Sequence, residues 1–155
     1  MGEIIRLIAL DILVVVVISL AVGISAPRWS GRWLSRDAGV LRAAPWESPA
    51  YFRRLPLATW AQVLPEWGAT FGGRSKRQAP EREPAAIQAY LVEVRRAEWV
   101  HWASAFSWIP LAFFNPWWLT LAFAIIVVAG NAPFMLILRG NRMRLESILT
   151  RLRKG

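Results

Sequence analysis

Three long apolar segments constrain the fold of this chain more than any other feature. Residues 4–24 and 117–138 are almost entirely apolar, and residues 87–114 are apolar after a charged start. About 20 apolar residues in a helix span the roughly 30 Å hydrocarbon core of a bilayer. The pattern predicts an all-α membrane protein with about three transmembrane helices in a single membrane domain. Residues 27–86 are then an interfacial, amphipathic or cytosolic region between the first two helices, and residues 139–155 are a basic tail.

The basic residues lie mainly between the apolar segments. The chain of 155 residues has 19 Lys and Arg against 10 Asp and Glu, a net charge of +9. Because basic loops stay on the cytosolic side of a membrane, we expect the 28–96 region and the tail in the cytosol. This arrangement predicts a multi-pass protein of the cell membrane that contacts membrane lipids. A nucleic-acid binder would carry its arginines on a soluble fold, which the three apolar segments argue against.

The first apolar segment allows two interpretations, a retained anchor or a secretory signal. We favour the anchor, because a cut after Ala26 would place Pro27 next to the scissile bond. Asp11 lies well inside this segment. Either it pairs with Arg6 or is protonated, which is the interpretation we favour, or it faces the other helices and joins a polar cluster.

Polar residues at the start of the 87–114 segment are the candidate catalytic group. They are Glu93, Arg95, Arg96, Glu98 and His101. Charge at membrane depth is costly and is usually retained for pairing or for function. Glu98 and His101 are three residues apart, so their side chains can touch on a helix. A carboxylate beside the single histidine of the chain is a candidate acid–base unit, and a purely structural histidine is the alternative.

A short turn joins the second and third predicted helices, so the start of one and the end of the other lie at the same membrane face. The tail beyond the third helix carries Arg139, Asn141, Arg142 and Arg144. The topology alone therefore places these groups opposite Glu93–His101, at the cytosolic face. The arginines either bind phosphates of a substrate or hold anionic lipid. Asn131 and Pro133 interrupt the third helix, as a packed kink or as part of a binding site.

No metal site or cofactor is predicted. The chain has no cysteine and only one histidine. A Glu-x-x-His pair without a second histidine is a poor zinc site.

These residues resemble a known family. The segments concerned are Arg96-Ala-Glu98-x-x-His101-Trp102, Phe114-Asn115, Asn131-x-Pro133 and Arg139-x-Asn141-Arg142-x-Arg144-Leu145, with Trp46-Glu47, Tyr51, Trp60, Leu64-Pro65 and Lys76 in the central region. Their order and spacing are similar to those of the glycosyl-4,4'-diaponeurosporenoate acyltransferases, small bacterial membrane enzymes that add a fatty acyl chain to a sugar-bearing carotenoid. The chain departs from the family pattern at Val94, Leu138, Gly140 and Met143, and Gly140 stands where the family usually has an aromatic residue.

The resemblance implies a membrane acyltransferase that esterifies a hydroxyl of a glycosylated lipid, with a glycosyl carotenoid as the implied acceptor and an acyl-CoA or a phospholipid as donor. In this scheme His101 is the general base, and Glu98 or Glu93 fixes its tautomer. The predicted substrate-binding residues also include Asn141. Asn131 or Arg96 would stabilise the oxyanion, and Arg139, Arg142 and Arg144 would bind the phosphates of the donor. The alternative is a non-catalytic membrane scaffold or lipid-binding partner of a lipid or pigment pathway, and the oligomeric state stays open.

Overall fold

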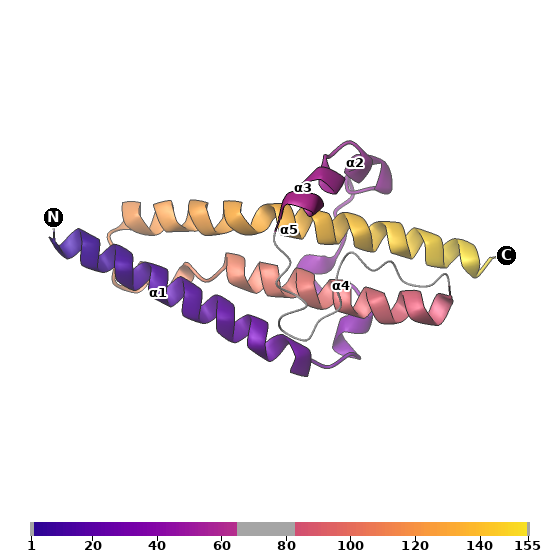
Figure 1. Ribbon diagram of the computed structural model, residues 1–155, viewed down its shortest axis with the longest axis horizontal. Coiled ribbons are helices and arrows are strands. Elements are labelled where there is room, and N and C mark those ends of the chain that lie inside the picture. Colours follow the sequence, from indigo (N-terminus) through magenta and orange to yellow (C-terminus); the bar gives the residue numbers. More distant parts are fainter. Residues whose placement is uncertain (1, 65–82, 155) are drawn as a thin grey trace.

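Two long antiparallel helices carry the rest of the fold. The computed structural model describes residues 2–64 and 83–154, and all regular structure within them is helical. Helix α4 (Pro84–Ala105) packs mainly against α5 (Trp117–Leu152). Helix α1 (Gly2–Ser25) lies along the half of this pair that is nearer the N-terminus (Figure 1). The predicted all-α class is confirmed.

The contact between α4 and α5 follows a stripe along α4. Two apolar clusters form it, one of Ile87, Leu91 and Leu149 and one of Tyr90, Val94 and Leu138. Spacings of three and four residues place such side chains on one face of a helix. Continuing the stripe beyond Val94 at the same spacing leads to Glu98 and His101, so the helix periodicity that builds the apolar contact also turns these two polar residues toward α5.

Apolar side chains are exposed over one half of the molecule. They cover α1 and the first part of α5, for example Leu13 and Val17 on α1 and Trp117, Ile125 and Ile126 on α5. Exposed apolar surface of this extent marks contact with a membrane or a partner. Among the described residues, the two segments Gly2–Arg28 and Trp117–Leu152 are long and apolar enough to cross a bilayer. Two candidate spans support a membrane protein.

The second predicted span, residues 87–114, differs from the structure. Helix α4 ends at Ala105, and a turn and the short 3-10 helix η4 (Ile109–Phe113) follow it. Pro110 lies at the start of η4, and α4 could not have continued through it, because a proline has no N–H to donate to the carbonyl four residues earlier. Helix α4 also carries four charged side chains near its middle, so it is not among the two candidate spans.

Helix α5 joins two segments that were predicted as separate elements. The predicted span 117–138 and most of the predicted tail 139–155 form one helix of 36 residues, with Pro133 inside it. The helix therefore continues without a break from the half of the molecule with the exposed apolar surface into the half that carries the charged residues from Arg139 onward.

Short helices occupy the region between α1 and α4. They are η1 (Ala26–Arg28), η2 (Trp33–Ser35), η3 (Gly39–Leu41), α2 (Pro49–Arg53) and α3 (Leu57–Val63). The 3-10 helices pack on α4, and α2 and α3 pack on α5 (Figure 1). The ring of Trp33 lies 5.0 Å from the ring of Trp99 on α4. Pro65 and Lys76, which contribute to the family resemblance, lie outside the described residues.

Candidate functional site

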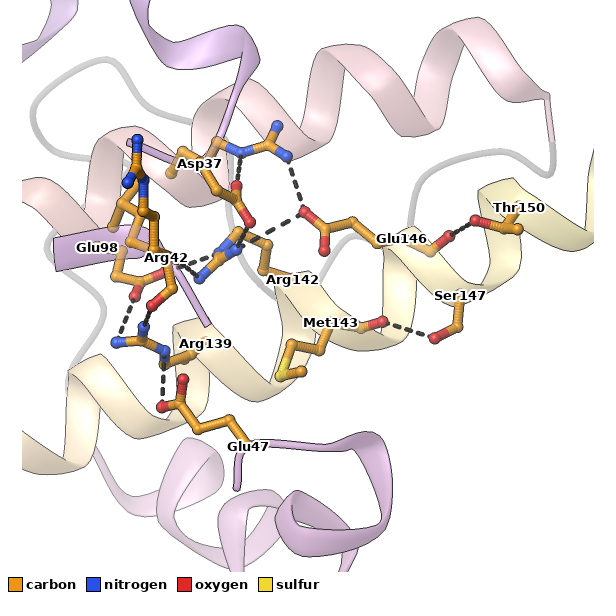
Figure 2. A network of polar contacts seen from close by, with 12 residues as sticks. Asp37, Arg42, Glu47, Glu98, Arg139, Arg142, Met143, Glu146, Ser147 and Thr150 are labelled. Atoms are coloured by element: carbon orange, nitrogen blue, oxygen red, sulfur yellow. Dashed lines mark hydrogen bonds and ion pairs between the residues drawn. The ribbon is translucent and has the colours of Figure 1, made fainter. Parts of the chain in front are cut away.

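Charged side chains gather where the α4–α5 contact leaves the apolar half of the molecule. We call them the ionic cluster: Asp37, Glu47, Arg95, Glu98, Arg139, Arg142 and Glu146 (Figure 2). Asp37 and Glu47 come from the region before α4, and the other members come from α4 and α5. The cluster therefore joins three parts of the chain that lie far apart in sequence.

Arg142 is at the centre of the ionic cluster. Its Nε donates to Oε2 of Glu98 at 3.0 Å, and both side chains are fully buried. Its Nη1 donates to Asp37, and its Nη2 donates to the carbonyl of Leu41 at 2.7 Å. Each guanidinium nitrogen of Arg142 thus already has an acceptor within the protein.

Arg139 makes a similar set of contacts one turn earlier on α5. Its Nη2 donates to the carbonyls of Arg42 at 2.6 Å and Val40 at 3.1 Å. Its Nε lies 2.9 Å from Oε1 of Glu47, and its Nη1 lies 3.6 Å from Oε1 of Glu98. Buried backbone carbonyls need donors, so Arg139 and Arg142 hold residues 40–42 against α5.

The ionic cluster is close to neutral as a whole. Arg95 completes it, with Nε 2.6 Å from Asp37 and Nη2 2.7 Å from Glu146. Three guanidiniums face four carboxylates, a formal sum of 3 − 4 = −1. Burial raises the pKa of Glu98, and the guanidiniums of Arg142 and Arg139 oppose that rise. Buried charges persist where partners of opposite sign surround them, which is the arrangement here.

His101 lies three residues beyond Glu98 on α4, about 4.5 Å farther along the helix axis. Its Nδ1 is 3.0 Å from Oδ1 of Asn131 on α5. Its ring stacks on Phe134, with ring centres 4.6 Å apart and planes 9° from parallel. The Nδ2 of Asn131 donates to the carbonyl of Val127 at 2.9 Å. His101 is therefore held from two directions by side chains of α5.

The other predicted site residues lie in the ionic cluster, beside His101, or nearer the surface. Both carboxylate oxygens of Glu98 lie against arginines, and Glu93 pairs with Arg96 on the same helix. Asn141 is half-buried and Arg144 is exposed. Of the predicted set, the structure brings His101 together with Asn131, and it brings Glu98 together with Arg139 and Arg142.

Three members of the ionic cluster, Asp37, Glu47 and Glu146, were not among the predicted site residues, although Glu47 belongs to the segments that carry the family resemblance. Asp37 had one weak signal: it is the single acidic residue between Asp11 and Glu47, in a segment rich in arginine. A lone carboxylate among arginines is a candidate for pairing, but its partners on α4 and α5 are set by tertiary packing.

A second polar contact lies in the apolar half of the molecule. Asp11 on α1 is fully buried and accepts a hydrogen bond of 2.8 Å from Nδ2 of Asn115, in the turn before α5. Asn115, and not Arg6, is the residue that the structure places against Asp11. Asp11 therefore faces the other helices, as the second of the two interpretations proposed.

A groove of about 660 Å³ lies beside the ionic cluster, between α4 and α5. Leu91 and Leu149 form part of its lining, and Gln88, Arg95 and Arg153 add polar groups. Its lining residues precede Glu98 on α4 and follow Arg142 on α5, so the groove lies beyond the ionic cluster as seen from the exposed apolar surface.

Comparison with known proteins identifies one family. A family model described as glycosyl-4,4'-diaponeurosporenoate acyltransferase matches residues 32–151. The matched range contains the whole ionic cluster, His101 and Asn131, and it begins after α1. No curated protein and no solved structure matches the chain.

Proposed function

Because the chain belongs to the glycosyl-4,4'-diaponeurosporenoate acyltransferase family, we propose that it transfers a fatty acyl group to a sugar hydroxyl of a glycosylated lipid at the cytosolic face of the cell membrane. The acceptor class follows the family name, and the donor is an acyl-CoA or a phospholipid. The observation that carries the proposal is the position of His101, held by Asn131 and Phe134 one helical turn from the ionic cluster.

The chemistry assigned to His101 is general base catalysis. A sugar hydroxyl becomes a competent nucleophile when a base takes its proton as the oxygen attacks the acyl carbonyl. The new ester C–O bond forms, the bond from the acyl carbon to the donor sulfur or oxygen breaks, and the imidazolium returns the proton to that leaving group. Protons and electron pairs balance without a nucleophilic serine or a metal ion.

The location of His101 suits an amphipathic acceptor. His101 lies between two kinds of surface along the α4–α5 pair. Large apolar side chains such as Phe106 and Val128 are exposed toward the turn between η4 and α5, and the ionic cluster lies in the opposite direction. An apolar carotenoid or acyl chain would lie along the exposed apolar surface, in the bilayer. Its sugar would then stand at the depth of His101, where the apolar surface gives way to charge.

We assign the ionic cluster a structural role in place of the predicted donor-binding role of Arg139 and Arg142. Each guanidinium nitrogen of Arg142 donates to a protein acceptor, so binding a phosphate there would break contacts that hold the fold. The groove beside the cluster is the place that we assign to the polar head of the donor. Arg95 in its lining is six residues from His101, about 9 Å along α4.

The alternative function, a non-catalytic membrane scaffold, has one observation in its favour. The charges of the ionic cluster form ion pairs with one another, as expected of a structural element that binds no substrate. A scaffold would need the apolar and basic surfaces but not the imidazole of His101.

Lipid mass spectrometry of a deletion strain tests the proposal and separates it from the scaffold. The strain is complemented with the wild type, with His101→Gln, or with Gln62→Ala at an exposed site on α3 as the control. We expect the wild type and the control to restore an acylated glycolipid, and His101→Gln to reach the membrane without restoring it. Full restoration by His101→Gln would exclude the enzyme and favour the scaffold.

A further inference from the structure

The hydrogen bonds of Asn131 determine which nitrogen of His101 carries the proton. The Nδ2 of Asn131 lies 2.9 Å from the carbonyl oxygen of Val127, which can only accept. The amide nitrogen must therefore face Val127, and the amide oxygen must face His101. Reversing the amide would set two acceptors against each other at Val127 and would lose a hydrogen bond.

The amide oxygen of Asn131 can only accept, so Nδ1 of His101, 3.0 Å away, must donate. A neutral imidazole has one N–H, and its other nitrogen carries the lone pair. We infer that Asn131 is a positioning residue that holds neutral His101 as the Nδ1–H tautomer and so makes Nε2 the basic nitrogen. The tautomer is inferred from the hydrogen bonds of Asn131, and the use of Nε2 as the base rests on the proposed function.

Two contacts together fix the direction of Nε2. Stacking on Phe134 at 9° sets the plane of the ring, and the hydrogen bond to Asn131 sets its rotation within that plane. In the Ser-His-Asp enzymes a buried carboxylate performs this task at Nδ1. Here a neutral amide on the facing helix performs it, and the neighbouring carboxylate of Glu98 lies against Arg142 and Arg139.

The single histidine of the chain makes the tautomer directly measurable. Protein labelled with ¹⁵N-histidine is measured in detergent or nanodiscs over a pH series, and the neutral ring is read at the alkaline end, where the spectrum no longer changes with pH. Its nitrogen spectrum then reports only His101. We expect Nδ1 to give the signal of a protonated nitrogen and Nε2 that of an unprotonated one. The reverse assignment in the wild-type protein overturns the inference, whatever the variants do.

Variants at Asn131 test whether this residue is the cause. Asn131→Leu removes the acceptor at similar size, so the Nδ1–H signal should give way to a mixture of tautomers. Asn131→Asp restores an acceptor at Nδ1 and should keep the wild-type pattern. Asn141→Leu, ten residues and about 15 Å farther along α5, is the matched control and should also keep it. An Asn131→Leu protein with the wild-type spectrum contradicts the inference.

Kinetics separate this role from a purely structural one. If Nε2 is the base, Asn131→Leu lowers kcat on the order of 10²-fold or more with little change in KM, and Asn131→Asp recovers part of the loss. Equal kcat values for the wild type and Asn131→Leu would contradict the positioning role. If the wild type shows no acyl transfer at all, the proposed function fails, while the nitrogen spectrum still decides the tautomer.

Discussion

The Nε of Arg142 lies 3.0 Å from Oε2 of Glu98, and neither side chain is exposed to solvent. This pair joins α5 to α4 at the level where the exposed apolar surface ends. Through Arg142 it also binds Asp37 and the carbonyl of Leu41. The pair is therefore the point at which three segments of the chain are fixed relative to His101.

Breaking this buried pair should be costly. Glu98→Gln removes the charge that Arg142 faces and should lower the free energy of unfolding by about 3 kcal/mol or more. Glu93→Gln is the matched control on the same helix, because Glu93 pairs with Arg96 at a partly exposed site. We expect less than about 1 kcal/mol from that change. Unfolding in detergent, followed by tryptophan fluorescence, measures both, and equal effects would contradict the assignment.

Gly140 allows α3 to approach α5. A Cβ built there would lie 2.7 Å from Cδ1 of Leu57 and 3.3 Å from Cδ1 of Phe52, while one at Gly130 would meet nothing within 4 Å. Gly130→Ala should be neutral or stabilise α5 by about 0.5–1 kcal/mol. Gly140→Ala should be about 1–2 kcal/mol worse than Gly130→Ala, because Leu57 must move. Thermal unfolding of the two variants tests this difference, and equal midpoints would show that α3 does not pack as described.

Asp11 should hold α1 to the rest of the fold. Asp11→Leu leaves the buried amide of Asn115 without its acceptor and should cost about 1–3 kcal/mol. Asp11→Asn keeps an acceptor for that amide and should cost less. Crosslinking between cysteines introduced in α1 and α4 measures the docking of α1 in the membrane. Identical crosslinking yields for wild type, Asp11→Leu and Asp11→Asn would show that the contact does not matter.

The orientation of the protein is testable because the chain has no cysteine. Phe113 is exposed at the end of η4, and Lys154 is exposed just beyond the far end of α5. A membrane-impermeant maleimide should label Phe113→Cys in intact cells, and it should label Lys154→Cys only after permeabilisation. The opposite pattern would place His101 and the ionic cluster near the outer face of the membrane.

Periodicity predicted much of the site but not its pairings. The sequence placed Glu98 and His101 on one helix face, and the structure turns that face toward α5. It did not predict that Asn131 would meet His101 and that Glu98 would meet Arg142. Helix periodicity fixes which residues share a face, whereas the register between two helices depends on how their side chains interlock.

The number of spans could not be fixed from the sequence for a related reason. The apolar content of residues 87–114 favoured one helix, while the end of α4 at Ala105 depends on the chain turning before Pro110. Asp37 was missed because its partners, Arg95 and Arg142, lie more than fifty residues away in sequence.

The most direct test of the account is the initial rate of acyl transfer by purified His101→Gln relative to wild type. The assay supplies glycosyl-4,4'-diaponeurosporenoate as acceptor, with a fatty acyl-CoA or a phospholipid as donor, and equal amounts of folded protein in the same detergent. We predict a loss of about 100-fold or more, the usual contribution of a general base, with an unchanged unfolding midpoint. A rate for His101→Gln equal to that of the wild type would contradict the assignment of His101 as the base.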